Sequence, residues 1–415
     1  MGLVTKEDID RALKVLEPVV VHTPLQYDRY LSEKYQATVL LKREDLQRVR
    51  SFKLRGAYYA IKQRSKEELS HGVVCASAGN HAQGVAYTCR EIRAQAVIFM
   101  PTTTPQQKIS QVTFFGGDYA KIRLVGDTFD ASCMAAKDFA AKNKMAFVDP
   151  FDDPDIIAGQ GTLAAEMTRD VLAGGYHLDY VLCAIGGGGL ISGVSTYIKN
   201  TSPGTKVVGV EPAGASSMKK AFDCGCPTPL ACLDKFVDNS RIELQTCPSS
   251  KEYVDDLVSI DEGQVCSSIL ELYSKQAIVA EPAGALSVAA LEIMKNEIKG
   301  KTVVCVISGG NNDINRMAEI EERSLIYQGL KNYYVVNFPQ RPGALKEFVS
   351  EVLGPNDDIT RFEYTKKINR GTGPVILGIL SKSKDDIPSL VKRIAAFDQC
   401  YIDLKENQTL YSLLV

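Results

Sequence analysis

The sequence has no excess of charge of either sign. Its 48 lysines and arginines nearly balance its 50 aspartates and glutamates, and the formal net charge is −2. A protein that binds nucleic acid through its phosphates needs a basic surface, which this balance does not predict. We therefore expect no nucleic-acid partner.

Long apolar runs are also missing. No run approaches the roughly 18 residues that a membrane-spanning helix needs, so we expect no membrane association. The first residues, "MGLVTKEDIDRALKVLEPVV", are rich in acidic side chains and lack the apolar stretch of a secretory signal. These absences favour a cytoplasmic protein.

Paired cysteines with C-x2-C spacing are absent as well, which argues against a zinc site. The eleven cysteines are odd in number, and several lie in apolar runs such as "VVCAS" and "VVCVI". Both features favour buried, reduced thiols in a reducing compartment. We predict no metal site.

What the chain does contain is enough apolar material for a large core, with 45% hydrophobic residues in 415. This length predicts two or three domains. Short apolar strand patterns alternate with helical patterns, which is typical of an α/β fold with parallel sheets covered on both faces. The strand patterns cover residues 37–44, 72–78, 94–101, 121–126, 180–186, 206–212 and 302–308.

The order of predicted strands and helices changes near the end of the chain. Residues 321–332 read as a helical connector, and residues 333–415 predict a strand, a helix, two strands, a helix and a last strand beginning at "YIDLKE". This βαββαβ order is the ferredoxin-like arrangement. We expect it to form a domain separate from residues 1–320.

Four consecutive glycines follow a predicted strand and open a helix in "IGGGGLISG", residues 185–193. Residues without a Cβ let several backbone N–H groups surround an anion, and the helix N-terminus adds a positive end. The pattern differs from the GxGxxG dinucleotide motif, so a single phosphate monoester fits better than a pyrophosphate. A flexible loop is the alternative.

Two more polar loops follow predicted strands. "SAGNHAQGVA", residues 77–86, offers a hydroxyl, an amide and N–H groups that suit a substrate carboxylate or a polar ring substituent; a plain N-cap is the alternative. "VISGGNND", residues 306–313, places Ser308 where its hydroxyl could meet a ring heteroatom, or simply forms a turn. Together with Lys53 in "SFKLRGAYYA", these loops point to pyridoxal phosphate, which needs a phosphate cradle, a ring pocket and an amine.

Several motifs give the chain a specific family resemblance. "SFKLRGA", "ASAGNHAQGVA", "DPFDDPDIIAGQGTLAAE", "IGGGGLISG", "AEPAGAL" and "SGGNND" resemble those of the threonine deaminases (threonine ammonia-lyases). These are fold-type II pyridoxal-phosphate enzymes with a two-domain catalytic region like the tryptophan synthase β chain. The resemblance spans nearly all of residues 1–320, with a smaller α/β subdomain at roughly 50–150. "FPQRPGALKEF" and "GPVILGIL" resemble the ACT-like regulatory domain of the biosynthetic branch.

The resemblance implies a role for each matching residue. Lys53 would form the Schiff base with the cofactor and act as the catalytic base, and Glu281 would lie close to the cofactor. The substrate-binding residues would be Ser77, Ala78, Gly79 and His81. The cofactor-binding residues would be Phe52, Lys53, Asn80, Gly186, Gly187, Gly188, Gly189, Leu190 and Ser308.

The implied reaction is the β-elimination and deamination of L-threonine to 2-oxobutanoate and ammonia, with L-serine as an alternative substrate. Serine racemases typically carry a serine where this chain has Ala78, so no acid–base group is expected on the opposite face. The related racemase cation site has a carboxylate where this chain has Ser217, which puts a cation at Glu211 in doubt. Asn239 also departs from the family pattern, in which glycine is usual.

For the last domain the resemblance implies allosteric control by isoleucine, opposed by valine, and a homo-oligomer that is a tetramer or a dimer. A dimerisation module without a ligand is the alternative. Two other activities stay open at this point: a degradative threonine/serine dehydratase, which usually lacks such a domain, and a non-catalytic amino-acid sensor.

Overall fold

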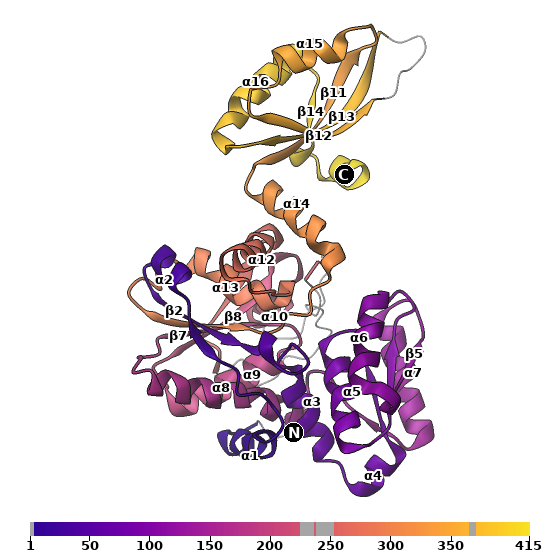
Figure 1. Cartoon of the computed structure of the whole chain (residues 1–415), viewed down its shortest axis with the longest axis vertical. Helices are drawn as coiled ribbons and strands as arrows, with labels where there is room; N and C mark the ends of the chain where they lie inside the picture. The colour runs from indigo at the N-terminus through magenta and orange to yellow at the C-terminus, as the bar shows by residue number, and fades with distance from the viewer. Residues whose placement is uncertain (1–3, 225–235, 238–252, 365–370) are drawn as a thin grey trace. The chain divides into compact units, whose positions relative to one another are not determined.

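The computed structural model describes residues 4–224, 236–237, 253–364 and 371–415. The chain divides into two compact units, Met1–Arg316 and Met317–Val415 (Figure 1). Helix α14 (Met317–Tyr327) opens the second unit, and strand β11 (Lys331–Pro339) follows it. The helix predicted over 321–332 therefore starts four residues before that stretch, and a strand begins within it.

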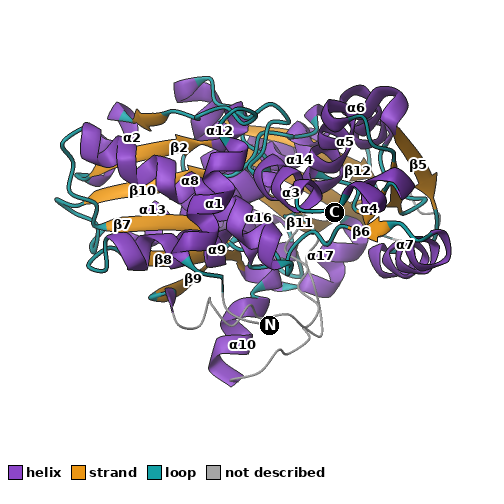
Figure 2. Cartoon of the chain, turned by 90° about the horizontal axis from the view of Figure 1, so that it is seen from below, coloured by secondary structure: helices purple, strands orange, loops and turns teal. Residues whose placement is uncertain are grey.

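The first unit contains a six-stranded sheet with the order β1-β2-β10-β7-β8-β9. Figure 2 shows its strands side by side. Only β1 is antiparallel to its neighbour. The strands are β1 (Leu25–Tyr27), β2 (Thr38–Arg43), β7 (Tyr180–Ala184), β8 (Lys206–Pro212), β9 (Asp256–Ile260) and β10 (Thr302–Ile307).

Helices cover both faces of this sheet, which is why the central strands are almost continuously apolar (Figure 1). One face carries α1 (Lys6–Leu16), α8 (Pro154–Ala173) and α9 (Gly189–Thr201), and the other α12 (Glu262–Gln276) and α13 (Pro282–Met294). Polar caps set where the helices begin: Thr5 forms a capping box with Asp8, and the Asp153 side chain accepts from the N–H of Asp155. The helix α2 (Arg29–Tyr35) joins β1 to β2.

A smaller, fully parallel sheet of order β5-β4-β3-β6 lies in the same unit. Its strands are β3 (Val73–Ala76), β4 (Ala96–Met100), β5 (Ala120–Leu124) and β6 (Ala146–Phe147), and the helices around it are α3 (Lys53–Lys62), α4 (Lys66–His71), α5 (Asn80–Ile92), α6 (Gln106–Gly116) and α7 (Phe129–Asn143). All seven predicted strand patterns form strands. The three that sequence analysis missed, β1, β6 and β9, are all edge strands of their sheets.

The second unit is an antiparallel sheet of order β12-β13-β11-β14. Its elements follow the predicted βαββαβ order, with α15 (Ala344–Glu351), β12 (Asp357–Tyr364), β13 (Thr372–Ser381), α16 (Ile387–Phe397) and β14 (Ile402–Asp403). The last strand is shorter than predicted because the Asp403 side chain caps a 3-10 turn, which leads into α17 (Gln408–Leu414).

The parallel strands bring three loops to the carboxyl ends of their sheets. Strands β3, β7 and β10 each run directly into one of the polar loops singled out in the sequence. This is where ligands bind in open α/β sheets. In the described part of the chain, no helix is both long and apolar enough to cross a membrane.

Candidate active site

The four glycines form the turn between β7 and α9. Gly188 is the N-cap residue of α9 and has a φ of 82°, a left-handed conformation that glycine adopts without strain. A Cβ on Gly187 would lie 2.2 Å from ring atoms of Phe151. The first N–H groups of α9 have no acceptor within the helix, so they and the helix dipole favour an anion at this turn.

Lys53 is the first residue of α3, and only 7% of it is exposed. Its Nζ donates a hydrogen bond to the carbonyl oxygen of Pro150 at 2.7 Å. The same atom lies 4.3 Å from the ring centre of Phe151 and 5.5 Å from that of Phe52. The amine is therefore enclosed by aromatic rings and kept away from water.

This enclosure changes the acidity of the amine. Burial lowers the pKa of Lys53 from 10.5 to about 8, and the carboxylates of Asp149 and Glu281 limit the shift. A lysine with such a pKa is partly uncharged near neutral pH, and the uncharged amine is the form that acts as nucleophile and base.

Asn80 and Ser308 reach the same place from two other loops. Asn80 begins α5, and its Nδ2 donates to Oε1 of Glu281 at 2.6 Å. Ser308 follows β10; its hydroxyl donates to the carbonyl of Ala283 at 3.3 Å, and its own carbonyl accepts the N–H of Phe52 at 3.1 Å. Residues that are far apart in the sequence thus surround Lys53.

The first turn of α5 presents a neutral histidine. Nε2 of His81 lies 3.2 Å from the carbonyl oxygen of Val148, which can only accept, so Nε2 carries the proton. Burial lowers the pKa of His81 to about 3, and the charge of Lys53 adds to the effect. Within the described residues Nδ1 has no partner, although it is buried. The ring is therefore an acceptor at physiological pH.

Two adjoining pockets gather every residue that the resemblance assigned to a role. One is lined, among others, by Phe52, Lys53, Asn80, Gly186, Gly187, Gly188, Gly189, Leu190, Glu281 and Ser308. The other shares Lys53, Asn80 and Glu281, and is also lined by Ser77, Ala78, Gly79 and His81. The predicted cofactor and substrate residues thus lie in two cavities with a common wall.

Sequence analysis missed Pro150, Phe151 and Asn311, which also line these pockets. Pro150 accepts the hydrogen bond of Lys53, and Phe151 packs beside the glycine turn. All three belong to motifs that carried the resemblance, but nothing in those motifs showed which side chains face the cavity.

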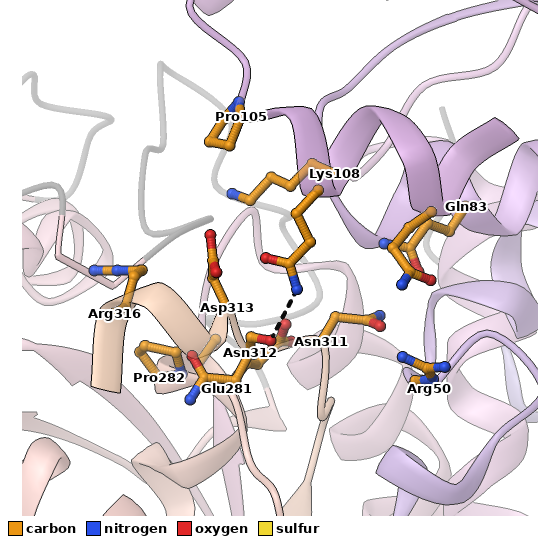
Figure 3. A pocket seen from close by; sticks show the side chains of 13 residues that line it. Arg50, Gln83, Pro105, Lys108, Glu281, Pro282, Asn311, Asn312, Asp313 and Arg316 are labelled. Carbon is orange, nitrogen blue, oxygen red and sulfur yellow. Dashed lines mark hydrogen bonds between the residues drawn. The ribbon is translucent and has the colours of Figure 1, made fainter. Parts of the chain in front are cut away.

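A third pocket continues from the second and shares Gln83, Lys108, Glu281 and Asn311 with it. Figure 3 shows Lys108 reaching in from α6, opposite Asp313 from the chain after β10. The pocket thus lies between segments that belong to the two sheets of the first unit. Most of its lining residues have polar or charged side chains, which suits an entrance for a charged substrate.

The carboxylate of Glu211 accepts hydrogen bonds at the N-terminus of a helix. Its two carboxylate oxygens accept the N–H groups of Met218 and Lys219 at 2.8 and 2.9 Å, at the start of α10 (Ser217–Cys224). Burial raises the pKa of Glu211 to about 7, and these N–H groups limit the rise. The described residues contain no group of three potential metal ligands. Asn239 lies outside the described residues.

The residues present fit pyridoxal phosphate. The glycine turn leaves out the Cβ that would meet Phe151, and N–H groups of a helix start lie beside it. Lys53 is a buried amine with a lowered pKa in the same cavity, and Ser308 adds a hydroxyl. A phosphate, an aldehyde and a ring nitrogen each find a suitable partner here.

Comparison with known families agrees with this geometry. Residues 16–309 match the family described as "Pyridoxal-phosphate dependent enzyme". Residues 322–414 match the "C-terminal regulatory domain of Threonine dehydratase". The two matches divide the chain much as its two compact units do.

Two relatives match the chain over nearly its whole length. "L-threonine dehydratase biosynthetic IlvA" of Lactococcus lactis subsp. lactis is 55% identical and is covered completely, as is this chain. The protein of the same name from Staphylococcus aureus is 58% identical over 99% of both chains.

Among solved structures, the processed form of threonine deaminase isoform 2 from Solanum lycopersicum superposes with a TM-score of 0.72 at 35% identity. The superposition covers 78% of this chain and 96% of the solved chain.

Proposed function

The chain belongs to the pyridoxal-phosphate-dependent enzymes, in the branch that carries the threonine dehydratase regulatory domain, and from that premise we propose that it deaminates L-threonine to 2-oxobutanoate and ammonia. The observation that carries the proposal is the buried amine of Lys53 beside the glycine turn, in a cavity lined by all the expected cofactor residues. The relatives named biosynthetic L-threonine dehydratase support this substrate and a place in isoleucine synthesis.

Lys53 is the catalytic residue of this proposal. Its amine would hold the cofactor covalently and, once displaced by the substrate amine, take the proton from Cα. Its lowered pKa provides the uncharged form that this step needs. When bound, the cofactor supplies an electron sink for the charge that develops at Cα.

The glycine turn at Gly186–Gly189 would hold the phosphate through backbone N–H groups, with Leu190 beside it. Asn80 and Ser308 would orient the ring. The loop Ser77–His81, at the start of α5, would receive the substrate carboxylate. Elimination removes the Cα proton and the β-hydroxyl, and water converts the released enamine to 2-oxobutanoate and ammonia.

Two residues favour elimination over competing reactions. Ser308 presents a hydroxyl, which does not force a ring nitrogen to stay protonated as a carboxylate would. Charge at Cα then has a short lifetime, which favours prompt loss of the β-hydroxyl. Ala78 offers no proton to the opposite face of Cα, which argues against racemisation.

The second unit is proposed to regulate the reaction, with isoleucine as inhibitor and valine as the opposing effector. Its match to a threonine dehydratase regulatory domain supports this assignment over the degradative alternative. The chain has one such domain, and we propose a homo-oligomer, a tetramer or a dimer, in the cytoplasm. Serine is proposed as a second substrate.

The test is an assay of purified protein with L-threonine. The wild type should show a near-visible absorbance band from bound cofactor and form 2-oxobutanoate, and isoleucine should slow the reaction. Lys53→Ala should lose the absorbance band, and its rate should fall by about 100- to 10,000-fold, because the change removes both the base and the attachment point. Undiminished deamination by Lys53→Ala would refute the proposal, and a wild type without cofactor would indicate a sensor.

A further inference from the structure

Three polar side chains form a short chain of hydrogen bonds beside Lys53. Nδ2 of Asn311 donates to the backbone carbonyl of Val49 at 2.9 Å and to Oδ1 of Asn80 at 2.7 Å. Nδ2 of Asn80 in turn donates to Oε1 of Glu281 at 2.6 Å. Figure 3 shows Asn311 and Glu281 among the side chains that line the adjoining pocket.

The bond between Asn311 and Val49 determines which atom donates in each of the other hydrogen bonds of this series. A backbone carbonyl can only accept, so the atom of Asn311 that faces Val49 must be its nitrogen. That nitrogen has two hydrogens, and the second points at Asn80. The atom of Asn80 that receives it must therefore be the oxygen, since two nitrogens would place donor against donor.

The orientation of Asn80 follows from this. With Oδ1 held by Asn311, its nitrogen faces Glu281 and the cavity that holds Lys53. One N–H is used by Glu281, and no other described residue accepts the second. Asn80 therefore presents a donor to the cavity.

The backbone keeps Asn311 in place. The N–H of Gly310 donates to the carbonyl of Arg50 at 2.9 Å, and the N–H of Phe52 donates to that of Ser308 at 3.1 Å. The segment before Lys53 and the loop after β10 are thus bonded at three successive points, counting Asn311 and Val49. A Cβ on Gly309 would lie 2.2 Å from Oε1 of Glu281, so a side chain there would displace the carboxylate that Asn80 contacts.

We propose that Asn311 is a positioning residue, which holds the amide of Asn80 with its nitrogen toward the cofactor cavity. This inference rests on the proposed function, since the oxygen that Asn80 would meet is the phenolic oxygen of pyridoxal phosphate. Asn311 acts through Asn80, and its importance comes from its two N–H groups.

The experiment is a double-mutant cycle with cofactor binding as its readout. Asn311→Asp replaces both N–H donors with acceptors at nearly constant volume, so the amide of Asn80 should turn and point its oxygen at the cavity. We expect the affinity for pyridoxal phosphate to fall about 10- to 100-fold, as when an orienting partner is lost. The absorbance maximum of the bound cofactor should shift as well. In an Asn80→Ala background the same change should have almost no further effect.

Asn315→Asp is the matched control, because it makes the same replacement four positions along, at an exposed residue. It should bind the cofactor like the wild type. Circular dichroism verifies that each variant is folded. If Asn311→Asp does not fold, Asn311→Ser, which keeps one donor, replaces it in the cycle and should show a smaller loss.

Two results would overturn the inference: unchanged affinity and spectrum in the Asn311 variant, or an equal loss with and without Asn80, which would mean a merely structural role. Failure of the proposed function is distinguishable, because the wild type itself would then bind no cofactor.

Discussion

At the scale of single residues, the chemistry depends on the amine of Lys53, which is buried away from water. Lys53 keeps one hydrogen bond, to the carbonyl of Pro150, and the rings of Phe52 and Phe151 fill the space around it. The carboxylates of Asp149 and Glu281 stay close enough to limit the shift of its pKa without abolishing it. Burial is thus the larger effect, and it prepares the amine for attack.

A pH dependence follows from the pKa of about 8 for Lys53. The rate at which cofactor-free protein attaches pyridoxal phosphate should rise about tenfold per pH unit below 8 and level off above it, because only the uncharged amine reacts. Stopped-flow absorbance measures this rate. An exposed lysine would keep accelerating to about pH 10.4, and that result would contradict the burial argument. Between pH 8 and 10.5 this group should also raise stability with pH, because only the unfolded chain still binds its proton.

The glycine turn makes a second prediction at this scale. Gly187→Ala would place a Cβ 2.2 Å from Phe151. Such overpacking costs about 1–3 kcal/mol, so we expect cofactor affinity to fall about 5- to 150-fold. Titration of the cofactor-free protein measures the change. Gly204→Ala is the control, because a Cβ there meets nothing within 4 Å. An equal loss of cofactor affinity in both variants would show that the glycine turn does not bind the cofactor.

At the scale of elements, helix α3 carries Lys53 and is anchored by a buried ionic cluster. Arg55 makes paired hydrogen bonds to the carboxylates of both Glu44 and Glu166, at 2.7–2.9 Å. Lys42 adds a bond to Glu166 at 2.8 Å. Burial opposes the charges, yet the two carboxylates raise the pKa of Arg55 above its ordinary value. The cluster joins α3 to β2, to the turn after it and to α8, two residues from the reactive lysine.

Removal of the central charge of this cluster should be costly. Arg55→Met leaves Glu166 with Lys42 and leaves Glu44 without the cation that pairs with it, and breaking a buried pair typically costs about 3–5 kcal/mol. The midpoint of chemical denaturation measures the loss. Arg29→Met, which breaks an exposed pair with Glu33, should cost less than about 1 kcal/mol. Similar midpoints for the two variants would mean that the cluster contributes nothing to stability.

At the scale of the whole molecule, catalysis and regulation belong to different compact units. All residues of the candidate active site lie before Arg316, and the second unit has its own core around Phe338 and Phe348. Each unit can therefore bury its own apolar surface. A ligand that binds the second unit can change the reaction only by favouring one of two states of the chain.

Removal of the second unit tests this division. Residues 1–316 alone should bind pyridoxal phosphate and deaminate threonine, because the site is complete within them. They should no longer respond to isoleucine. Initial rates with and without isoleucine measure both properties. Full inhibition of the shortened chain would place the effector site in the first unit.

Much of the fold could be predicted because its signals are local. A buried parallel strand reads as a short apolar run wherever it lies, and a glycine run between strand and helix marks an anion site without further context. Strands β1, β6 and β9 escaped prediction because few of their residues are buried, and β1 and β6 have only three and two residues. Helix α17 escaped although it has a local start signal, since the side chain of Asn407 accepts the N–H of Leu410.

The sequence by itself determined the fold class, the cofactor, and Lys53, Asn80 and Ser308 as candidates, because motifs of a few residues carry that chemistry. Only the tertiary structure decided how these groups are held. Asn80 meets Glu281 and Asn311 across 201 and 231 residues, and the donor direction between them comes from one carbonyl, that of Val49. Burial, the protonation of Lys53 and the tautomer of His81 depend on such distant neighbours, and no local pattern encodes them.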